Sequence, residues 1–299
     1  MNDNIETKNL RLIFIGAGNI AQSIVKGLLN CSYLNSKQIF VYAPTERNSQ
    51  IFRDLGCHFT TNVQDIISSK TTESNLHFLL FICVKPNIAK QSEFLSMFNE
   101  ILLKKSNENF LIVSVMAGIT LEWIESNLTI ENRSNFRDNL VRIMPNTAIE
   151  INMGTIGVYW KSSTATTTTN DLLIKKLSEL LNQLGKSIKL DNEEQLHSII
   201  GVAGSGIAFI LTMIQGMIDG GVSVGLSRNL SRDLVIQTFI GAAKMIEKTG
   251  TNPIQLRDNV CSPAGTTIAG VEILEQNALN GTIIQAVKKS AERSKELSK

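Results

Sequence analysis

The sequence predicts an α/β fold, with a doubly wound parallel sheet followed by an all-helical domain. Two observations carry this prediction. Up to residue 190, short apolar runs alternate with stretches of helical period, and from Asp191 onward only helical periods remain. Strands that alternate with helices are typical of a parallel sheet covered by helices on both faces. We therefore expect a sheet domain over residues 1–190 and a helical domain over residues 191–299.

The first strand and helix carry a glycine motif. Leu12 to Ile15 form a buried-strand pattern, and Gly16, Gly18 and Ala21 follow at the spacing G-x-G-x-x-A before a helical stretch. In this motif the first glycine permits a tight turn, the second lets a pyrophosphate approach the backbone, and the third small residue allows close helix–strand packing. The helix N-terminus then offers free N–H groups to the phosphates. The pattern predicts a Rossmann-type dinucleotide site, although a steric turn alone is the alternative.

Further strands are expected at 38–42, 58–60, 76–84, 110–115 and 140–144, and a helix at 88–103. Ligands of such sheets bind beyond the carboxyl ends of the strands. Those ends are expected at residues 16–19, 43–45, 84–86, 116–118 and 145–146, so five turns along one edge define the predicted site.

The end of the second strand favours NADPH. An Asp or Glu at this place usually binds the ribose 2′-hydroxyl of NAD. This chain has Tyr42-Ala-Pro-Thr45, with Glu46 somewhat late, and Arg47 is a candidate partner for a 2′-phosphate. We expect NADPH as the preferred donor and NADH as the alternative, while a purely solvent-exposed Arg47 is the competing interpretation.

Composition excludes several classes of function. With 29 basic and 27 acidic residues the net charge is +2, which gives no electrostatic case for nucleic acid or a membrane surface. Four scattered cysteines and three histidines form no metal-ligand spacing, so we expect no metal site. The polar start MNDNIETKNL shows no targeting pattern, and we expect a cytoplasmic protein with a small-molecule substrate.

The helical domain has two notable stretches. Ile207 to Ile218 is apolar on every side, so we expect a second subunit to bury part of it, with an ordinary monomeric bundle as the alternative. Asp258 to Gly270 reads DNVCSPAGTTIAG and leads into a helix that begins near Thr267. Hydroxyls and N–H groups at a helix start suit a carboxylate, although the local features alone favour a simple capped turn between two helices.

Several motifs together resemble one family. GAGNIAQSIVKGL, the Val84-Lys85-Pro86 turn, RIMPNTA, GVAGSGIAF, DGGVSVGLSR, GAAKM and DNVCSPAGTTIAGVEILE follow the order found in pyrroline-5-carboxylate reductases. The resemblance implies hydride transfer from NADPH or NADH to the C=N bond of 1-pyrroline-5-carboxylate, the last step of proline synthesis. It also implies that residues 191–299 form a dimerisation and substrate domain, with dimers assembled into a larger homo-oligomer such as a decamer.

The resemblance also implies the site residues by position. Those for the cofactor are Ile15, Gly16, Ala17, Gly18, Asn19, Ile20, Ala43, Asn62, Cys83, Val84, Lys85, Pro86, Ala117 and Asn259, and Arg47 joins them as the candidate for the 2′-phosphate. Those for the substrate are Ser205, Gly265, Thr266 and Thr267, with Thr267 as the catalytic residue that hydrogen-bonds the substrate. Thr267 and water are the candidates for proton delivery to nitrogen.

Two departures from the family pattern stand out. Ile207 replaces the proline of GSGPAY, and Ala264 replaces a glycine of SPGG. If position 264 requires a positive φ, alanine there would be strained by about 1 kcal/mol. A dinucleotide-binding sensor without turnover is therefore one alternative. A β-hydroxyacid dehydrogenase is the other, but such enzymes generally need a lysine that is absent between Lys189 and Lys244.

Overall fold

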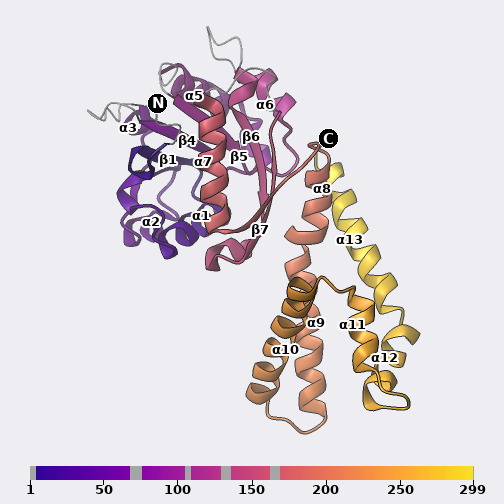
Figure 1. The fold of residues 1–299 in the computed structure, drawn as a ribbon. Coiled ribbons are helices and arrows are strands. Elements are labelled where there is room, and N and C mark those ends of the chain that lie inside the picture. Colours follow the sequence, from indigo (N-terminus) through magenta and orange to yellow (C-terminus); the bar gives the residue numbers. More distant parts are fainter. Residues whose placement is uncertain (1–4, 68–75, 105–108, 129–135, 162–168, 299) are drawn as a thin grey trace. The chain divides into compact units, whose positions relative to one another are not determined.

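The computed structural model describes residues 5–67, 76–104, 109–128, 136–161 and 169–298 (Figure 1). The chain divides into two compact units. The first is Met1–Gly204 together with Ala291–Lys299, and the second is Ser205–Ser290. The change from alternating strands and helices to helices alone begins at residue 191 of the sequence, before this division at Gly204. We keep 1–190 and 191–299 as the proposed limits of the two functional domains.

The first unit is built on one sheet in the order β3-β2-β1-β4-β5-β6-β7-β8. Its strands are β1 (Leu10–Ile15), β2 (Ile39–Tyr42), β3 (His58–Thr60), β4 (His77–Ile82), β5 (Asn109–Ser114), β6 (Leu140–Pro145), β7 (Gly154–Tyr159) and β8 (Gly185–Lys189). All neighbours are parallel except β6 and β7, which are antiparallel. The expected doubly wound parallel sheet is thus confirmed, and its one antiparallel junction lies where a short 3₁₀ segment, Thr147–Ile151, replaces a crossover helix.

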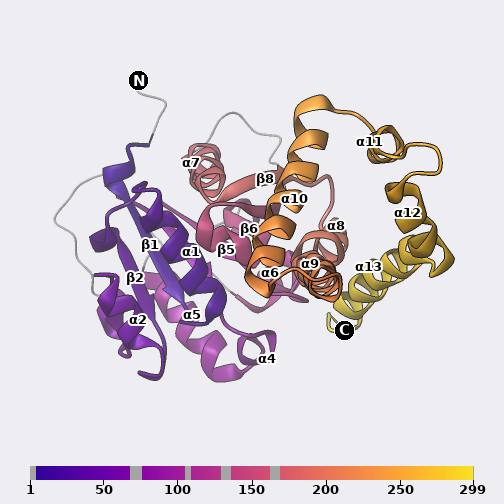
Figure 2. The ribbon, with the colours of Figure 1, turned by 90° about the horizontal axis from the view of Figure 1, so that it is seen from below.

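Helices cover both faces of this sheet. Leu12 and Phe14 of β1 face a core layer shared with α1 (Asn19–Asn30), α2 (Ser49–Asp54) and α7 (Thr169–Gln183). Ile13 and Ile15 face the opposite layer, shared with α3 (Val63–Ile67), α5 (Ser92–Lys104) and α6 (Leu121–Asn127). Successive residues of a strand point to opposite faces, so a continuous apolar run is buried from both sides. Figure 2 shows α1 lying along β1.

The expected single helix at 88–103 is two helices. Pro86 occupies the first turn of α4 (Pro86–Ala89), and α5 begins only at Ser92. Between them Lys90 is a C-cap, and Gln91 donates its N–H to the carbonyl of Ile88 in a tightened turn. Apolar spacing continues across this break, which is why the sequence pattern did not reveal it.

Short helical segments complete the first unit. They are the 3₁₀ segments Thr7–Asn9, Ser36–Gln38 and Phe136–Asn139, then α8 (Gln195–Ile199) and a π-helical turn, Ile200–Gly204. The expected polar loop at 161–170 lies mostly outside the described residues; of it, Lys161 is exposed and α7 begins at Thr169.

The second unit contains only helices. They are α9 (Gly206–Ser223), α10 (Arg228–Thr249), α11 (Pro253–Val260), α12 (Thr266–Gln276) and α13 (Leu279–Glu296), whose last turn belongs to the first unit. α9 and α10 form a hairpin, in which Ser231 Oγ donates to the carbonyl of Ile218 at 2.8 Å and Arg228 pairs with Asp219 at 2.8 Å. α11 and α12 follow one another through a short loop (Figure 2).

The helical unit leaves most of its apolar side chains exposed. Ile218 and Val235 are its only buried large apolar residues, whereas Leu211, Leu234 and Ile240 are 57%, 51% and 50% exposed. By length and composition alone, the helical run Gln195–Ser223 could cross a membrane, and 11% of its most apolar window is buried. One such helix is weak evidence for a membrane, because apolar helices of soluble proteins pass the same test.

Candidate functional site

The β1–α1 loop is shaped by Gly16. Its φ is +110°, and its N–H donates to the carbonyl of Tyr42 at 2.8 Å. A Cβ at this position would lie 2.8 Å from the carbonyl carbon of Cys83. Both the backbone conformation and the close approach of the β4 end therefore require glycine. The loop is thus locked between the ends of β2 and β4.

Glycine at position 18 is explained by something other than its backbone conformation. It is the N-cap of α1, has an ordinary φ of −76° and carries no side-chain cap. A Cβ there would meet only the carbonyl oxygen of Cys83, at 3.9 Å. The first N–H groups of α1, from Asn19 onward, therefore stand open at a helix N-terminus, where the dipole favours an anion. The geometry leaves bare backbone where a pyrophosphate would approach.

A side chain that the sequence reasoning missed braces this loop. Asn48 Nδ2 donates to the carbonyl of Ala17 at 2.8 Å, and Gln22 Nε2 reaches the same oxygen at 3.2 Å. Asn48 follows β2, so it connects the second turn of the edge to the first. Its contact spans 31 residues, and no local pattern announces it.

The acid nearest to the end of β2 is occupied elsewhere. Glu46 pairs with Arg53 at 2.8 Å, and hydrogen bonding with Ser49, with the Arg53 charge adding to it, lowers the pKa of Glu46. Arg47 is exposed in the same turn. A carboxylate paired with the following helix α2 is unsuited to a ribose 2′-hydroxyl, which agrees with the expected preference for a 2′-phosphate.

Two of the predicted cofactor residues, Ala43 and Asn62, follow the neighbouring strands β2 and β3. Ala43 donates its N–H to the carbonyl of Thr60 at 3.2 Å, and Asn62 follows Thr60 at the same edge. Asn62 Oδ1 accepts from the Gln64 N–H at 3.1 Å, so its side chain already begins the α3 turn. Asn62 is exposed just beyond the carboxyl end of β3.

The ends of β4 and β5 carry the other first-unit residues. Cys83 is buried, donates its N–H to the carbonyl of Ile15 at 2.8 Å, and burial raises the pKa of its thiol far above the ordinary value. The Cys83 thiol is therefore an uncharged part of the lining of this edge. Lys85 is the exposed N-cap of α4, Pro86 is its first residue, and Val84 is half-buried. Ala117 is exposed in the turn after β5.

The predicted substrate residues belong to the helical unit. Gly265 is the N-cap of α12 and has no side-chain cap, so the N–H groups of Thr266 and Thr267 open that helix without intrahelical partners. Ala264 has a φ of +55°, so the condition for strain set by the sequence is met. Such an array of donors suits a carboxylate.

Two further residues of this unit have intramolecular partners. The hydroxyl of Ser205 lies 2.7 Å from that of Ser290, and Asn259 Oδ1 accepts from Gln255 Nε2 at 3.1 Å. The predicted cofactor residues between Ile15 and Ala117 thus lie in the turns along one edge of the sheet. Ser205, Asn259 and the start of α12 belong to the other unit.

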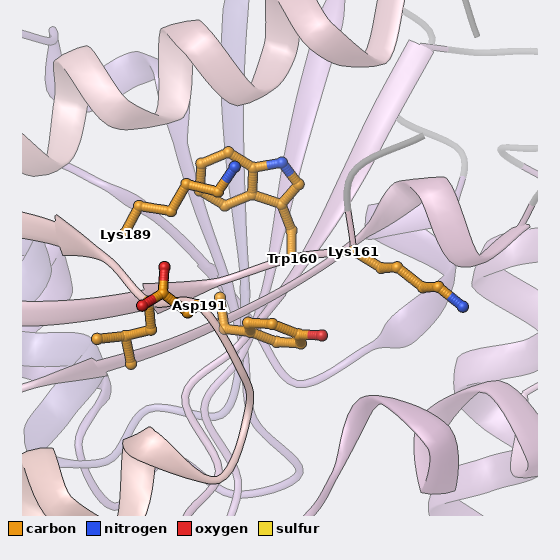
Figure 3. Close-up of a pocket in the computed structure, with 6 residues that line it drawn as sticks. Trp160, Lys161, Lys189 and Asp191 are labelled. Atoms are coloured by element: carbon orange, nitrogen blue, oxygen red, sulfur yellow. The ribbon is translucent and has the colours of Figure 1, made fainter. Parts of the chain in front are cut away.

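A cavity of about 360 Å³ lies elsewhere on the first unit (Figure 3). It is lined by Tyr159, Trp160, Lys161, Lys189, Leu190 and Asp191. Lys189 Nζ lies 4.2 Å from the centre of the Trp160 ring, so its charge already has an aromatic partner. The cavity contains none of the predicted site residues. Among the described side chains, no three of His, Cys, Asp and Glu come together as a metal site.

Two family models match separate parts of the chain. A model described as pyrroline-5-carboxylate reductase dimerisation matches residues 193–297, and one described as NADP oxidoreductase, coenzyme F420-dependent, matches residues 11–118. The first covers the helices with the exposed apolar side chains. The second covers the glycine loop and the first four turns of the sheet edge.

Curated relatives match almost the full length. A pyrroline-5-carboxylate reductase from Arabidopsis thaliana is 32% identical over 299 residues, covering 98% of each chain. The enzyme from Escherichia coli K12 is 30% identical, over 96% of this chain and 97% of its own. A solved pyrroline carboxylate reductase from Plasmodium falciparum with NADP bound is 26% identical, with a TM-score of 0.78 over 97% of this chain and 99% of that one. A Coxiella burnetii pyrroline-5-carboxylate reductase is 27% identical, with a TM-score of 0.76 over 97% and 98%.

Proposed function

This chain belongs to the pyrroline-5-carboxylate reductase family, and on that premise we propose that it reduces the C=N bond of 1-pyrroline-5-carboxylate with NADPH to give L-proline. The observation that carries the proposal is the extent of the similarity, which covers 98% of this chain and includes both units. The reaction balances simply: a hydride is added to the imine carbon, a proton is added to nitrogen, and NADPH becomes NADP⁺.

The first unit fits NADP on its own geometry. Gly16 and the uncapped N-terminus of α1 offer the cradle that a pyrophosphate needs. Arg47 would hold the 2′-phosphate, with Ala43 and Asn62 beside the adenosine ribose. The turns at Cys83 and Ala117 would line the remaining part of the dinucleotide. NADPH, when bound, supplies the hydride.

The second unit supports recognition of the substrate. The backbone from Gly265 to Thr266 would hold the substrate carboxylate, and the Thr267 hydroxyl would hydrogen-bond the ring. Ser205 and Asn259 would lie near the substrate and the cofactor. A site that reduces an imine needs orientation, exclusion of water and donors for charge, and no metal or nucleophile. Thr267 or a water molecule would deliver the proton.

We further propose that the protein works as a homo-oligomer. The dimerisation model covers the helices whose apolar side chains stand exposed, and a second copy would bury them. We propose a larger assembly such as a decamer and a cytoplasmic location. Contact with membranes or nucleic acid is not expected.

One assay tests the proposed function. Purified protein is mixed with NADPH and 1-pyrroline-5-carboxylate, and the absorbance of the reduced nicotinamide is followed. We expect substrate-dependent loss of NADPH, with NADH less effective at equal concentration. Binding of NADPH without oxidation would instead support a dinucleotide-binding sensor without turnover. The positive φ of Ala264 is the observation that favours this alternative.

A further inference from the structure

The turn after β5 is held at both ends by one ion pair. Arg142 on β6 donates from Nη1 to Glu193 Oε1 at 2.7 Å and from Nη2 to the carbonyl of Met116 at 3.4 Å. The same Glu193 oxygen accepts the N–H of Leu121 at 2.8 Å. Met116 begins the turn and Leu121 begins α6, so the pair brackets residues 116–120.

Burial makes this bracket stiff. The side chain of Arg142 is fully buried and that of Glu193 is 20% exposed. A buried guanidinium is costly without its carboxylate, so the two groups stay together. Hydrogen bonds to charged groups are also shorter and stronger than neutral ones. The loop after β1 is held differently, by the neutral side chains of Asn48 and Gln22.

The C-terminal segment closes the other side of the turn. Gly118 has a φ of +81°, and a Cβ there would lie 2.9 Å from the carbonyl oxygen of Leu297. That segment is itself anchored, because His197 Nδ1 lies 2.8 Å from Ser294 Oγ. Gly118 is therefore buried under the chain end, while its neighbour Ala117 remains exposed at the carboxyl edge.

We propose that Arg142 and Glu193 are positioning residues, which fix the 116–120 turn against the nicotinamide end of NADPH. The inference rests on the proposed function for the identity of the cofactor. With the pyrophosphate at α1 and the adenosine at β2, a dinucleotide extends along the edge toward β4 and β5. Neither charged group touches the cofactor in this account. They act through the backbone at Met116 and Leu121.

The test compares NADPH with 2′-phospho-ADP-ribose, which lacks the nicotinamide. Glu193→Gln keeps the shape but leaves the charge of Arg142 uncompensated. We expect the Kd for NADPH to rise about tenfold and kcat to fall, because misplacing a reacting group by about 1 Å is costly. The Kd for 2′-phospho-ADP-ribose should stay within about twofold, since that fragment does not reach the turn. A purely structural role would change both constants together, or neither.

A matched control removes a comparable pair elsewhere. Glu179→Gln removes the negative charge from the 3.1 Å contact with the largely buried Lys176 on α7 and should change neither Kd. Arg142→Lys keeps the positive charge but loses the two guanidinium nitrogens that donate to Glu193 and Met116. We therefore expect this variant to bind NADPH less tightly than the wild type. An equal loss of affinity for both ligands in Glu193→Gln, or no loss for either, overturns the proposal.

The unmodified protein gives a second reading that needs no variant. Amide exchange in residues 116–121 should slow when NADPH binds and stay unchanged with 2′-phospho-ADP-ribose. Equal protection by the two ligands, or none, contradicts the proposed role. A protein that binds NADPH but does not reduce 1-pyrroline-5-carboxylate overturns only the proposed function. One that binds neither ligand overturns both.

Discussion

At the scale of single residues, two glycines of one motif have different physical roles. Gly16 is required by the fold, because its φ is +110° and Cys83 lies against it. Gly18 has an ordinary φ and open space on the side where a Cβ would stand. The fold therefore leaves room for a side chain at Gly18, and the approach of a pyrophosphate is our proposed reason for its glycine.

We expect Gly16→Ala and Gly18→Ala to separate folding from binding. Gly16→Ala should lower the free energy of unfolding by roughly 2 kcal/mol or more, from the positive φ and the clash. Gly18→Ala should change it by less than about 1 kcal/mol and yet raise the Kd for NADPH at least tenfold. Urea unfolding and fluorescence titration measure the two effects. Full NADPH affinity in Gly18→Ala would contradict the cradle.

Ala264 and Ala278 form a natural pair for measuring strain. Both have positive φ, at +55° and +50°, and both lie in the helical unit. Replacing either by glycine should relieve about 1 kcal/mol of strain, partly offset by the greater entropy of the unfolded chain. Only Ala264→Gly should also lower the KM for 1-pyrroline-5-carboxylate, because only its Cβ borders the proposed carboxylate site. Equal kinetics in both variants would remove Ala264 from the substrate site.

At the scale of elements, the start of α12 carries the proposed substrate contact. Thr267→Ala should lose one hydrogen bond of roughly 1–2 kcal/mol, so kcat/KM should fall about tenfold. Thr267→Ser retains the hydroxyl and should keep most of the activity. Steady-state kinetics decide this, and an unchanged kcat/KM in the alanine variant would exclude Thr267 from the mechanism.

The anchor between α8 and α13 predicts a pH dependence of stability. His197 is 3% exposed, and desolvation lowers its pKa below 6.5, helped by the charges of Arg142 and Lys295 and opposed by those of Glu194 and Glu193. The unfolded chain then binds the proton more readily than the folded one. The stability that this histidine contributes is therefore complete above pH 6.5 and is lost as pH falls through the lowered folded pKa.

His197→Gln should flatten the fall in unfolding free energy between about pH 7 and pH 5. Part of the slope should remain, because burial also lowers the pKa of His77. His58→Gln, which changes an exposed histidine, provides the control. Denaturant unfolding at several pH values gives the slopes, and identical slopes in wild type and His197→Gln would show that the anchor is not coupled to a proton.

The elements that the sequence predicted well are those with local signals. β1, β2 and β4 to β6 follow from apolar runs ended by glycine or proline, and Thr120 is a typical N-cap residue whose Oγ1 accepts from the Trp123 N–H at 3.0 Å. The contacts that escaped prediction are long-range. Asn48 reaches Ala17, and Glu193 reaches Leu121 across 72 residues. Such contacts depend on which turns the completed sheet brings together, and no periodicity encodes that.

At the scale of the whole molecule, the two units differ in how they are stabilised. The sheet unit has an apolar core on each face, whereas Ile218 and Val235 are the only large apolar side chains buried in the helical unit. Apolar area removed from water is the main favourable term in folding and association. The second copy that we propose would therefore complete the core of the helical unit.

Light scattering coupled to size exclusion should give a mass of at least twice the 32.9 kDa of one chain. Leu234→Glu, on the exposed side of α10, should shift the protein toward smaller species because it places a charge in the interface. Leu103→Glu makes the same change at a 44% exposed site on α5 and should leave the mass unchanged. A wild-type protein that elutes as a monomer would contradict the proposed assembly.

Direct hydride transfer from NADPH to the cyclic imine can be tested by labelling the transferred hydrogen with deuterium. The protein is incubated with 1-pyrroline-5-carboxylate and with NADPH in which both hydrogens on C4 of the nicotinamide are replaced by deuterium. The product is analysed by mass spectrometry. We expect L-proline with one deuterium, located on the ring carbon that was the imine carbon. Unlabelled proline, or NADPH that is bound but never oxidised, would contradict it.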